Sequence, residues 1–312
     1  MAPGVTEIDP PAPLRSAVYG APPSELAEAP ADAVQVSPLR PGGEALEAQA
    51  DAALDSILIA APPGSIERRF VLAHALRALK PGGVLTALAA NDKGGQRLRA
   101  ELEGFGCEVA ERSKARQRIC TVLRPAALQG IEASIAEGAP QLVTETGFVS
   151  QPGVFSWNRI DPGSALLLTH LPKLSGRGAD LGAGLGVLSR AVLALPDVSE
   201  LSLVELDRRA VDAARRNVSD PRARFLWSDA REAPLADLDF VVTNPPFHAE
   251  GIEDRGLGQS FIGAAARMLR RSGTLLLVAN RHMPYEAVLR AAFRSVDVRA
   301  EEAGYKIFEA RK

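Results

Sequence analysis

Short apolar strand patterns alternate with helical patterns along the second half of this 312-residue chain. Parallel strands cannot be joined by a tight turn and need a crossover connection, which is usually a helix. The alternation therefore predicts βαβ units and a doubly wound, mostly parallel α/β sheet. The expected strands are 178–181, 201–205, 224–227, 238–243 and 274–279, and the expected helices are 186–195, 208–217 and 258–271.

A weaker form of the same alternation runs through the first half. The expected strands are 33–36, 56–60, 84–89, a short one near Val109 and 119–123, and the expected helices are 70–79 and 95–104. Residues 125–153 carry little periodic signal, which is typical of a connector. We therefore expect two α/β domains, residues 1–125 and 151–312, joined by a linker at residues 126–150.

The two halves share a pattern that indicates an internal duplication. A strand ends in Ala60-Ala61-Pro62-Pro63-Gly64 in the first half and in Thr243-Asn244-Pro245-Pro246-Phe247 in the second. The Pro-Pro pairs lie 183 residues apart, from position 62 to 245, and later Ala-Asn pairs lie 189 apart, from position 91 to 280. This alignment places Ala61 opposite Asn244, and the first half lacks a glycine-rich loop.

Composition excludes several classes of protein. The net charge is −2, which rules out a strongly basic, histone-like coat. Two cysteines, Cys107 and Cys120, cannot build a disulfide framework and fit reduced thiols in a cytoplasmic protein. No apolar run reaches the roughly 18 residues of a membrane span, and the N-terminus lacks a secretory signal pattern. We expect a cytoplasmic protein without a membrane segment.

A glycine-rich turn, Gly182-Ala183-Gly184-Leu185-Gly186, joins a predicted strand to a predicted helix. Glycines let the backbone approach a ligand closely, and a helix start presents free N–H groups. A plain tight turn between strand and helix is the structural alternative. A dinucleotide fingerprint beginning at Gly182 would need glycine or alanine where Val187 stands, so the spacing argues against a dehydrogenase. The carboxylate of Asp180 would repel a pyrophosphate and favours a ligand that carries an ammonium group.

Acids follow the next two strands. Glu205 ends a strand 23 residues after Gly182, where a carboxylate can accept hydrogen bonds from both hydroxyls of a ribose. Asp229, followed by Ala230, closes the third strand and could bind an adenine amino group. Acids are also common at helix starts and in turns, so both positions keep a purely structural alternative.

The segment Thr243-Asn244-Pro245-Pro246-Phe247-His248 carries the most specific chemistry. Two prolines impose a rigid, extended turn directly after a strand. Such a turn can present the side-chain carbonyl of Asn244 and the backbone carbonyl of Pro245 to the two hydrogens of a planar –NH2 group. The ring of Phe247 offers a face on which a base can stack. Binding both hydrogens brings the nitrogen lone pair into position to attack an electrophilic methyl group. The segment therefore predicts methylation of an amine nitrogen, and a plain turn after a core strand is the structural alternative.

These residues resemble class I S-adenosylmethionine-dependent methyltransferases with the Asn-Pro-Pro-Phe motif. More narrowly, the chain is similar to the bacterial small-subunit (16S) ribosomal-RNA guanine-N2 methyltransferases, whose catalytic half is a "methyltransferase small" domain. The narrower resemblance uses three segments: Pro152-Gly153-Val154-Phe155-Ser156 with Asp161-Pro162-Gly163-Ser164, Asn244 to His248, and Val278 to Tyr285.

The resemblance implies two tandem Rossmann-like methyltransferase domains, each a seven-stranded, mostly parallel sheet with one antiparallel strand, the N-terminal one degenerate. S-adenosylmethionine would be the cofactor, and no metal is implied. The implied cofactor-binding residues are Phe155, Asp161, Gly163, Asp180, Gly182, Gly184, Gly186, Glu205, Asp229, Ala230 and Asn244. The implied catalytic residues are Asn244, Pro245, Pro246 and Phe247.

Other functions share the four-residue motif. It also serves adenine-N6 methylation of nucleic acids and glutamine-N5 methylation of proteins, and the duplicated N-terminal half favours the ribosomal-RNA function. A non-catalytic RNA-binding assembly factor is a further alternative. The expected partner is ribosomal RNA or a ribosomal subunit, and we expect the protein to be a monomer.

Basic residues suggest where RNA could bind. Arg112, Lys114, Arg116 and Arg118 alternate along the chain and would share one face of an extended strand. Contact with RNA phosphates is one interpretation, and a solvated hairpin tip is the other. His248 and Arg281 are further candidates for contact with the RNA.

Overall fold

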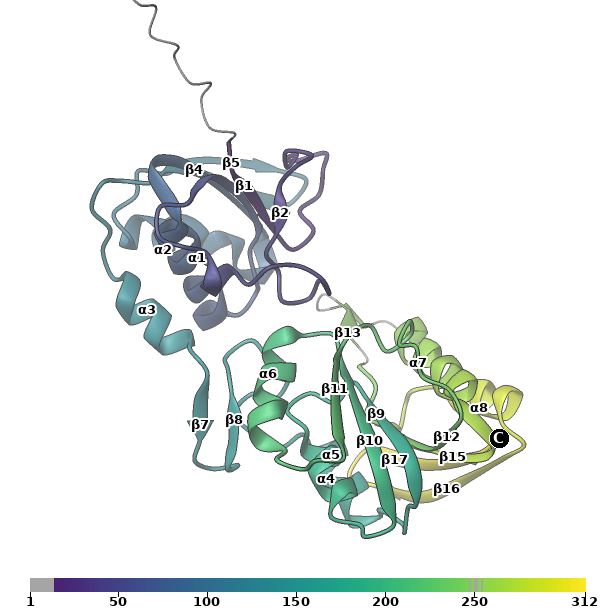
Figure 1. Ribbon diagram of the computed structural model, residues 1–312. Coiled ribbons are helices and arrows are strands. Elements are labelled where there is room, and N and C mark those ends of the chain that lie inside the picture. The colour runs from purple at the N-terminus through teal and green to yellow at the C-terminus, as the bar shows by residue number, and fades with distance from the viewer. Residues whose placement is uncertain (1–13, 247, 250–251, 254) are drawn as a thin grey trace, which may run out of the picture. The chain divides into compact units, whose positions relative to one another are not determined.

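The computed structural model in Figure 1 describes residues 14–246, 248–249, 252–253 and 255–312. These residues form two compact units. The first runs to Ser37 and from Gly43 to Glu137, and the second comprises Pro38–Gly42 and Gly138–Lys312. The boundary at Glu137 therefore lies within the predicted linker.

The first unit is built on a six-stranded sheet of order β2-β1-β3-β4-β6-β5, in which β6 runs antiparallel to both of its neighbours. Leu72 of α1 and Ile57 of β3 belong to the large core on one face of the sheet, whereas Leu58 belongs to a smaller cluster. The elements are β1 (Ser16–Tyr19), β2 (Val34–Gln35), η1 (Leu46–Ala48), β3 (Leu54–Ala60), α1 (Ser65–Ala78), β4 (Leu79–Ala90), η2 (Asn91–Gly95), α2 (Gln96–Gly104), β5 (Ala110–Lys114), β6 (Gln117–Leu123) and α3 (Ile131–Gly138).

The second unit contains a seven-stranded sheet of order β11-β10-β9-β12-β15-β17-β16, in which β17 runs antiparallel to both of its neighbours. Helices α4, α5 and α6 lie on one face of the sheet and α7 and α8 on the other (Figure 1). Their buried side chains contribute to the core on each face. The prediction of a doubly wound, mostly parallel α/β sheet is confirmed.

The elements of the second unit begin with a two-stranded pair, β7 (Gln141–Val143) and β8 (Phe148–Ser150). They continue with α4 (Pro162–Thr169), β9 (Gly176–Leu181), α5 (Val187–Leu193), β10 (Val198–Glu205), α6 (Arg208–Asn217), β11 (Ala223–Trp227), β12 (Leu238–Thr243), β13 (His248–Ala249), β14 (Ile252–Glu253), α7 (Arg255–Met268), β15 (Leu269–Asn280), α8 (Glu286–Ala292), β16 (Ser295–Glu302) and β17 (Tyr305–Arg311).

Strand registers support the duplication and correct its alignment. Ser56 pairs with Val84 in the first unit as Phe240 pairs with Thr274 in the second, and both ladders carry a register shift one residue earlier. The offset between the units is therefore 184 residues in β3 and β12, from position 56 to 240. Ala60, rather than Ala61, is the counterpart of Asn244, because the proline pair comes one residue later after the first unit's strand.

An ion pair is repeated along with the register. Asp55 accepts hydrogen bonds from Lys80 at 2.7 Å and from the backbone N–H of Arg15 at 2.8 Å. Asp239, its counterpart, accepts them from Arg270 at 2.6 Å and from the backbone N–H of Arg177 at 2.7 Å. A shared polar contact of this kind does not follow from the α/β architecture alone, so it favours descent of both units from one ancestor.

The first unit departs from the sequence predictions in one respect. Its sheet has six strands rather than seven, and among the described residues nothing corresponds to β11. The predicted linker, residues 126–150, contains α3, β7 and β8, which the sequence analysis did not predict. These elements have only 8, 3 and 3 residues, so they are too short to produce a clear hydrophobic period.

Two observations concern membranes and metals. Among the described residues, no helix combines the length and the apolar character needed to cross a bilayer. Within the same residues, histidine, cysteine and acidic side chains do not gather in threes at a position that could hold a metal ion. Cys107 and Cys120 are both buried free thiols.

Candidate active site

The Asn-Pro-Pro segment begins where β12 ends. Thr243, the last residue of that strand, is fully buried, and its hydroxyl donates a 2.7 Å hydrogen bond to the carbonyl of Leu181 at the end of β9. Because β9 and β12 are parallel neighbours, both carboxyl ends lie at the same edge of the sheet. The Thr243 bond therefore holds the Asn-Pro-Pro segment next to the glycine-rich turn.

The side-chain amide of Asn244 is held by two acceptors. Its Nδ2 donates to Asp161 Oδ1 at 2.7 Å and to Ser164 Oγ at 2.9 Å. Both amide hydrogens are thereby used, since a primary amide nitrogen carries two. Within the described residues, the carbonyl oxygen Oδ1 of Asn244 and the backbone oxygen of Pro245 accept no hydrogen bond. These are two acceptors available to a ligand.

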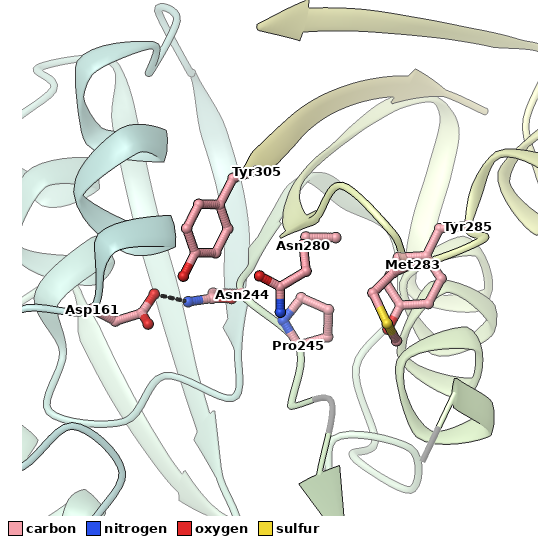
Figure 2. A pocket seen from close by; sticks show the side chains of 8 residues that line it. Asp161, Asn244, Pro245, Asn280, Met283, Tyr285 and Tyr305 are labelled. Carbon is pink, nitrogen blue, oxygen red and sulfur yellow. Dashed lines mark hydrogen bonds between the residues drawn. The ribbon is translucent and has the colours of Figure 1, made fainter. Parts of the chain in front are cut away.

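A small pocket surrounds this amide (Figure 2). Figure 2 shows Asp161 and Tyr305 on one side of Asn244, with the Asn280 amide beside Pro245 and with Met283 and Tyr285 further along. The lining residues are Asp161, Asn244, Pro245, Ala279, Asn280, Met283, Tyr285 and Tyr305. The pocket combines amide groups with aromatic rings, which suits a flat, polar group such as a nucleobase.

The glycine-rich turn adopts the backbone conformation that its sequence predicts. Gly182, Gly184 and Gly186 all have positive φ angles of 71°, 52° and 83°, which side chains rarely adopt. A Cβ on Gly182 would lie 3.3 Å from the ring of Phe261 and 3.9 Å from Pro246, so the turn lies close to the second proline. Around Gly184, by contrast, no atom lies within 4 Å of such a Cβ. The turn is open at Gly184.

Asp180 is completely buried at the end of β9. Ser189 of α5 donates a 2.6 Å hydrogen bond to its Oδ2, while its Oδ1 has no hydrogen-bond partner in the part of the chain that the structure describes. Burial, partly offset by the Ser189 bond, raises the pKa of Asp180 to about 7. A buried oxygen without a partner costs free energy, and a cationic ligand would remove that cost.

Glu205 ends β10 on the other side of the turn. One oxygen accepts the backbone N–H of Gly184 at 2.9 Å, and the other accepts the backbone N–H of Asp207 at 2.8 Å. Burial raises the pKa of Glu205 above its ordinary value, although these backbone bonds act in the opposite direction. Each oxygen keeps a further lone pair, so the carboxylate can still accept hydrogen bonds from a diol.

The other predicted cofactor residues have varied surroundings. Asp229 forms an ion pair with Arg231, and hydrogen bonds from that guanidinium hold the pKa of Asp229 below its ordinary value. Ala230 is buried in the core beside α7. Phe155 is exposed to solvent over 62% of its surface. Gly163 allows close packing, because a Cβ there would lie 2.9 Å from the ring of Tyr305.

Two predicted residues have no described side chain. Phe247 lies outside the described residues, and of His248 only the backbone, in β13, is described. Arg281 follows β15, is exposed, and has its backbone N–H bonded to the carbonyl of Gly304 at 2.8 Å. It lies one residue beyond Asn280, which lines the pocket.

The basic residues predicted to share one face do not lie on a single strand. The chain turns at Ala115 and Arg116, which have positive φ angles, so β5 carries Arg112 and Lys114 while Arg118 lies on β6. Arg112 and Lys114 donate to backbone carbonyls of Leu26 and Glu25, at 2.8 and 3.2 Å. Arg118 pairs with Glu111 at 2.7 Å. A hairpin tip is the second interpretation that the sequence leaves open for this segment, and the structure has a turn here between the antiparallel strands β5 and β6.

In the first unit, the edge of the sheet at the carboxyl ends of its parallel strands lacks the acids and the amide found in the second unit. Through the strand registers, Val18 corresponds to Asp180, Ser37 to Glu205 and Ala60 to Asn244. The backbone carbonyls of the first unit's proline pair already accept hydrogen bonds: the fully buried Arg68 donates to Pro62 at 3.1 Å and to Pro63 at 2.9 Å. The first unit therefore offers neither the acids nor the amide of the second.

Sequence reasoning missed several residues that line the pocket or hold Asn244 beside it. Ser164 follows Asp161 in a segment that the prediction assigned to cofactor binding, and nothing local indicates that it contacts Asn244, 80 residues away. Tyr305 begins β17, and only its pairing with Asn280 across the sheet brings it to the pocket. For Asn280 the repeat itself was a signal, because its Ala-Asn pair ends a strand in both halves.

Comparison with known proteins identifies related chains. The family model described as the methyltransferase small domain matches residues 145–309, just over half of the chain. A ribosomal RNA small subunit methyltransferase C from Shewanella sp. (strain MR-4) is 34% identical over 173 residues, covering 54% of this chain and 51% of that protein. Among the first such relatives, the chain spans about half of their length. The protein of the same name from Shewanella halifaxensis is 29% identical over 264 residues, covering 83% and 77%.

One solved structure is similar along nearly the whole chain. It is described as T. thermophilus 16S rRNA N2 G1207 methyltransferase (RsmC) in complex with AdoMet and guanosine. Its TM-score is 0.77 at 26% sequence identity, and the match covers 98% of this chain and 89% of the other. The similarity therefore extends over both α/β units.

Proposed function

This chain belongs to the methyltransferase small domain family, and we propose that it transfers a methyl group from S-adenosylmethionine to the exocyclic N2 amine of a guanine in small-subunit ribosomal RNA. The support is the Asn-Pro-Pro geometry together with relatives named as ribosomal RNA small subunit methyltransferases. The similar solved structure contains AdoMet and guanosine, which favours guanine-N2 over adenine-N6 or glutamine-N5 as the target.

The observation that carries the proposal is the orientation of the Asn244 amide. Its nitrogen is committed to Asp161 and Ser164, so its oxygen is left to accept a hydrogen bond. With the carbonyl of Pro245 as second acceptor, the site can bind both hydrogens of one –NH2 group. Two such bonds fix the direction of the nitrogen lone pair, and alignment of this kind supplies much of the rate enhancement in a displacement reaction.

The second unit has groups that fit S-adenosylmethionine. Asp180 would face its ammonium group, the turn Gly182 to Gly186 would lie against its methionine part, and Glu205 would accept the ribose hydroxyls. The buried Asp180 oxygen without a partner is the observation that supports this fit. When bound, the cofactor supplies an electrophilic methyl group on sulfur.

The other predicted cofactor contacts remain part of this proposal. We expect Asp229 and Ala230 near the adenine and Phe155 and Gly163 near the methionine end. Asp229 would have to share its carboxylate between the adenine amino group and Arg231. Asp161 already contacts Asn244, so we assign it to the amide rather than to the cofactor.

The reaction needs no metal ion and no strong general base in this proposal. Asn244 and Pro245 hold the amine, Phe247 would stack on the base, and Pro246 keeps the segment rigid. The proton that the nitrogen loses after transfer can pass to water. His248 and Arg281 would contact the RNA near the pocket.

The two units would have different roles. Residues 151–312 would carry catalysis, while residues 1–125, which lack the counterparts of Asp180 and Asn244, would contribute to RNA binding or stability. The basic hairpin at Arg112, Lys114, Arg116 and Arg118 is the candidate RNA contact in the first unit. A ribosomal substrate would place the enzyme in the cytoplasm, and we propose that it acts as a monomer.

A direct assay tests the function. The purified chain would be incubated with methyl-labelled S-adenosylmethionine and either naked small-subunit ribosomal RNA or the assembled subunit, and the digested nucleosides would be analysed by mass spectrometry. We expect N2-methylguanosine at one position. N6-methyladenosine instead would replace the guanine assignment, and cofactor binding without methylation of either RNA substrate would contradict the proposal.

A further inference from the structure

We propose that Asp161 and Ser164 are positioning residues that prevent the Asn244 amide from rotating, so that its carbonyl oxygen always faces the amine to be methylated. This inference rests on the proposed function, because it assigns a role in the same site. Neither residue needs to touch the substrate. Their effect would pass entirely through Asn244.

Amide orientation matters because the two ends of an asparagine side chain have nearly the same shape and opposite hydrogen-bonding character. With Oδ1 toward the pocket, Asn244 accepts a hydrogen from the substrate amine. A half-turn would present Nδ2–H2 to a nitrogen that is itself a donor. That arrangement would lose the hydrogen bond and leave two donors facing each other.

The chemistry of the two neighbours decides the orientation. An ionised carboxylate has only acceptor atoms, so Asp161 can bind Nδ2 at the observed 2.7 Å but would repel Oδ1. The bond is also charge-assisted, which makes it stronger than a bond between neutral groups. Ser164 Oγ, at 2.9 Å, takes the second amide hydrogen. A hydroxyl could also donate to Oδ1, so the acceptor-only Asp161 decides the orientation and Ser164 adds a second bond to it.

Asp161 and Ser164, which together form a clamp on the Asn244 amide, are themselves held in place by the start of α4. Asp161 is the N-cap of that helix, and its Oδ1 also accepts the backbone N–H of Ser164 at 2.9 Å. Pro162, the first residue of the helix, fixes the backbone there. Ser164 is only 9% exposed. Asp161 Oδ1 therefore has a fixed place before any substrate arrives.

Gly163 lets the clamp lie this close to the pocket. A Cβ at this position would lie 2.9 Å from the ring of Tyr305 and 3.1 Å from Asp161 Oδ1. Any larger residue would push the start of α4 away from β17 and from Asn244. The Asp-Pro-Gly-Ser sequence thus combines a cap, a rigid first turn, a close approach and the second acceptor.

Two variants of Asp161 separate positioning from helix capping. Asp161→Ser keeps a good N-cap, but its shorter side chain cannot reach Asn244. Asp161→Asn keeps an oxygen of the same reach without the charge. We expect kcat to fall about 10- to 100-fold in Asp161→Ser, as for loss of a charged hydrogen bond, and to be largely retained in Asp161→Asn. The Kd for S-adenosylmethionine and the melting temperature should stay near wild-type values.

Two variants of Ser164 form a second matched pair for the test. Ser164→Ala removes the second acceptor and should lower kcat by less than Asp161→Ser, because that bond is between neutral groups. Ser164→Thr keeps the hydroxyl and should restore the activity. Loss of cofactor affinity in parallel with kcat would instead make Asp161 a cofactor ligand and would overturn the inference.

The amide itself gives a readout that does not depend on methyl transfer. The side-chain NH2 resonance of Asn244, assigned by its loss in Asn244→Ala, should exchange slowly with water in the wild type and faster in Asp161→Ser. Equal exchange rates in the two proteins would overturn the clamp. Slow wild-type exchange without methylation of any RNA would refute the proposed function while supporting the clamp.

Discussion

Ser189 donates a 2.6 Å hydrogen bond to one oxygen of the buried Asp180 carboxyl, while the other oxygen has no partner among the described residues. A hydroxyl satisfies only half of a carboxylate, and burial raises the pKa of Asp180 to about 7. The ligand-free protein therefore holds a carboxyl group that changes charge near neutral pH. A cationic ligand at the second oxygen would favour the ionised form.

Cofactor affinity should rise with pH through neutrality. Below pH 7 a proton occupies Asp180 and must be released before an ammonium group can bind, whereas above pH 7 the carboxylate is already formed. We expect affinity to increase several-fold between pH 6 and pH 8, measured by calorimetry with S-adenosylmethionine. Asp180→Asn should bind weakly and show no such pH dependence. Wild-type affinity independent of pH would contradict the role of Asp180.

Stability of the ligand-free protein should follow the opposite trend. The pKa of Asp180 in the folded protein, about 7, is above its ordinary value of 3.8, so between these values the native state binds more protons than the unfolded state. Its contribution is therefore greatest below pH 4 and is lost as the pH rises to about 7. In urea unfolding, the free energy of unfolding of the wild type should fall by up to about 4 kcal/mol relative to that of Asp180→Asn as the pH rises through this range. A constant difference between the two proteins would show that the carboxyl does not titrate there.

The sequence was sufficient to locate Asp180, Glu205 and Asn244, because each stands at the end of an apolar strand and parallel strands bring those ends to one edge. It could not reveal that Asn244 contacts Asp161, 83 residues away, because that contact depends on how α4 meets the sheet. The basic hairpin shows a similar limit. The sequence left a shared strand face and a hairpin tip as alternatives, and only the backbone shows that the turn falls at Ala115 and Arg116.

Asn244→Ala should abolish methyl transfer and leave cofactor binding intact. The side chain contacts Asp161 and Ser164 rather than the glycine-rich turn, so its removal takes away one acceptor for the amine without altering Asp180 or Glu205. We expect at least a thousandfold loss in kcat, since loss of alignment adds to loss of the hydrogen bond. Calorimetry should give a wild-type Kd for the cofactor, and near-normal turnover would remove Asn244 from the mechanism.

Arg68 should be important for the stability of the first unit. Its guanidinium is fully buried, forms a two-pronged ion pair with Glu101 at 2.6 and 2.7 Å, and donates to the Pro62 and Pro63 carbonyls. Arg68→Ala would leave a largely buried carboxylate without its partner, which costs about 3–5 kcal/mol. Chemical unfolding measures this loss. Arg99→Ala, which breaks the exposed ion pair with Glu103 and a longer one with Glu111, is the matched control and should cost far less, because solvent screens such pairs.

Arg116 is the hairpin residue best suited to contact RNA. The other three basic side chains are occupied, since Arg112 and Lys114 donate to backbone carbonyls and Arg118 pairs with Glu111. Within the described residues, the exposed guanidinium of Arg116 makes no hydrogen bond or ion pair. It is therefore free to bind a phosphate without losing an existing contact.

Charge reversal should separate Arg116 from its neighbours. Arg116→Glu should weaken RNA binding and lower the slope of log affinity against log salt by about 1, as expected when one phosphate contact is lost. Its melting temperature should not change, because the side chain holds no other group. Arg112→Glu should instead lower the melting temperature, because it breaks the bond to Leu26. Arg290→Glu, an exposed α8 residue with the same change in charge, controls for net charge. If it reduces RNA affinity and the salt slope as much as Arg116→Glu, the effect belongs to overall charge, and the hairpin contact is wrong.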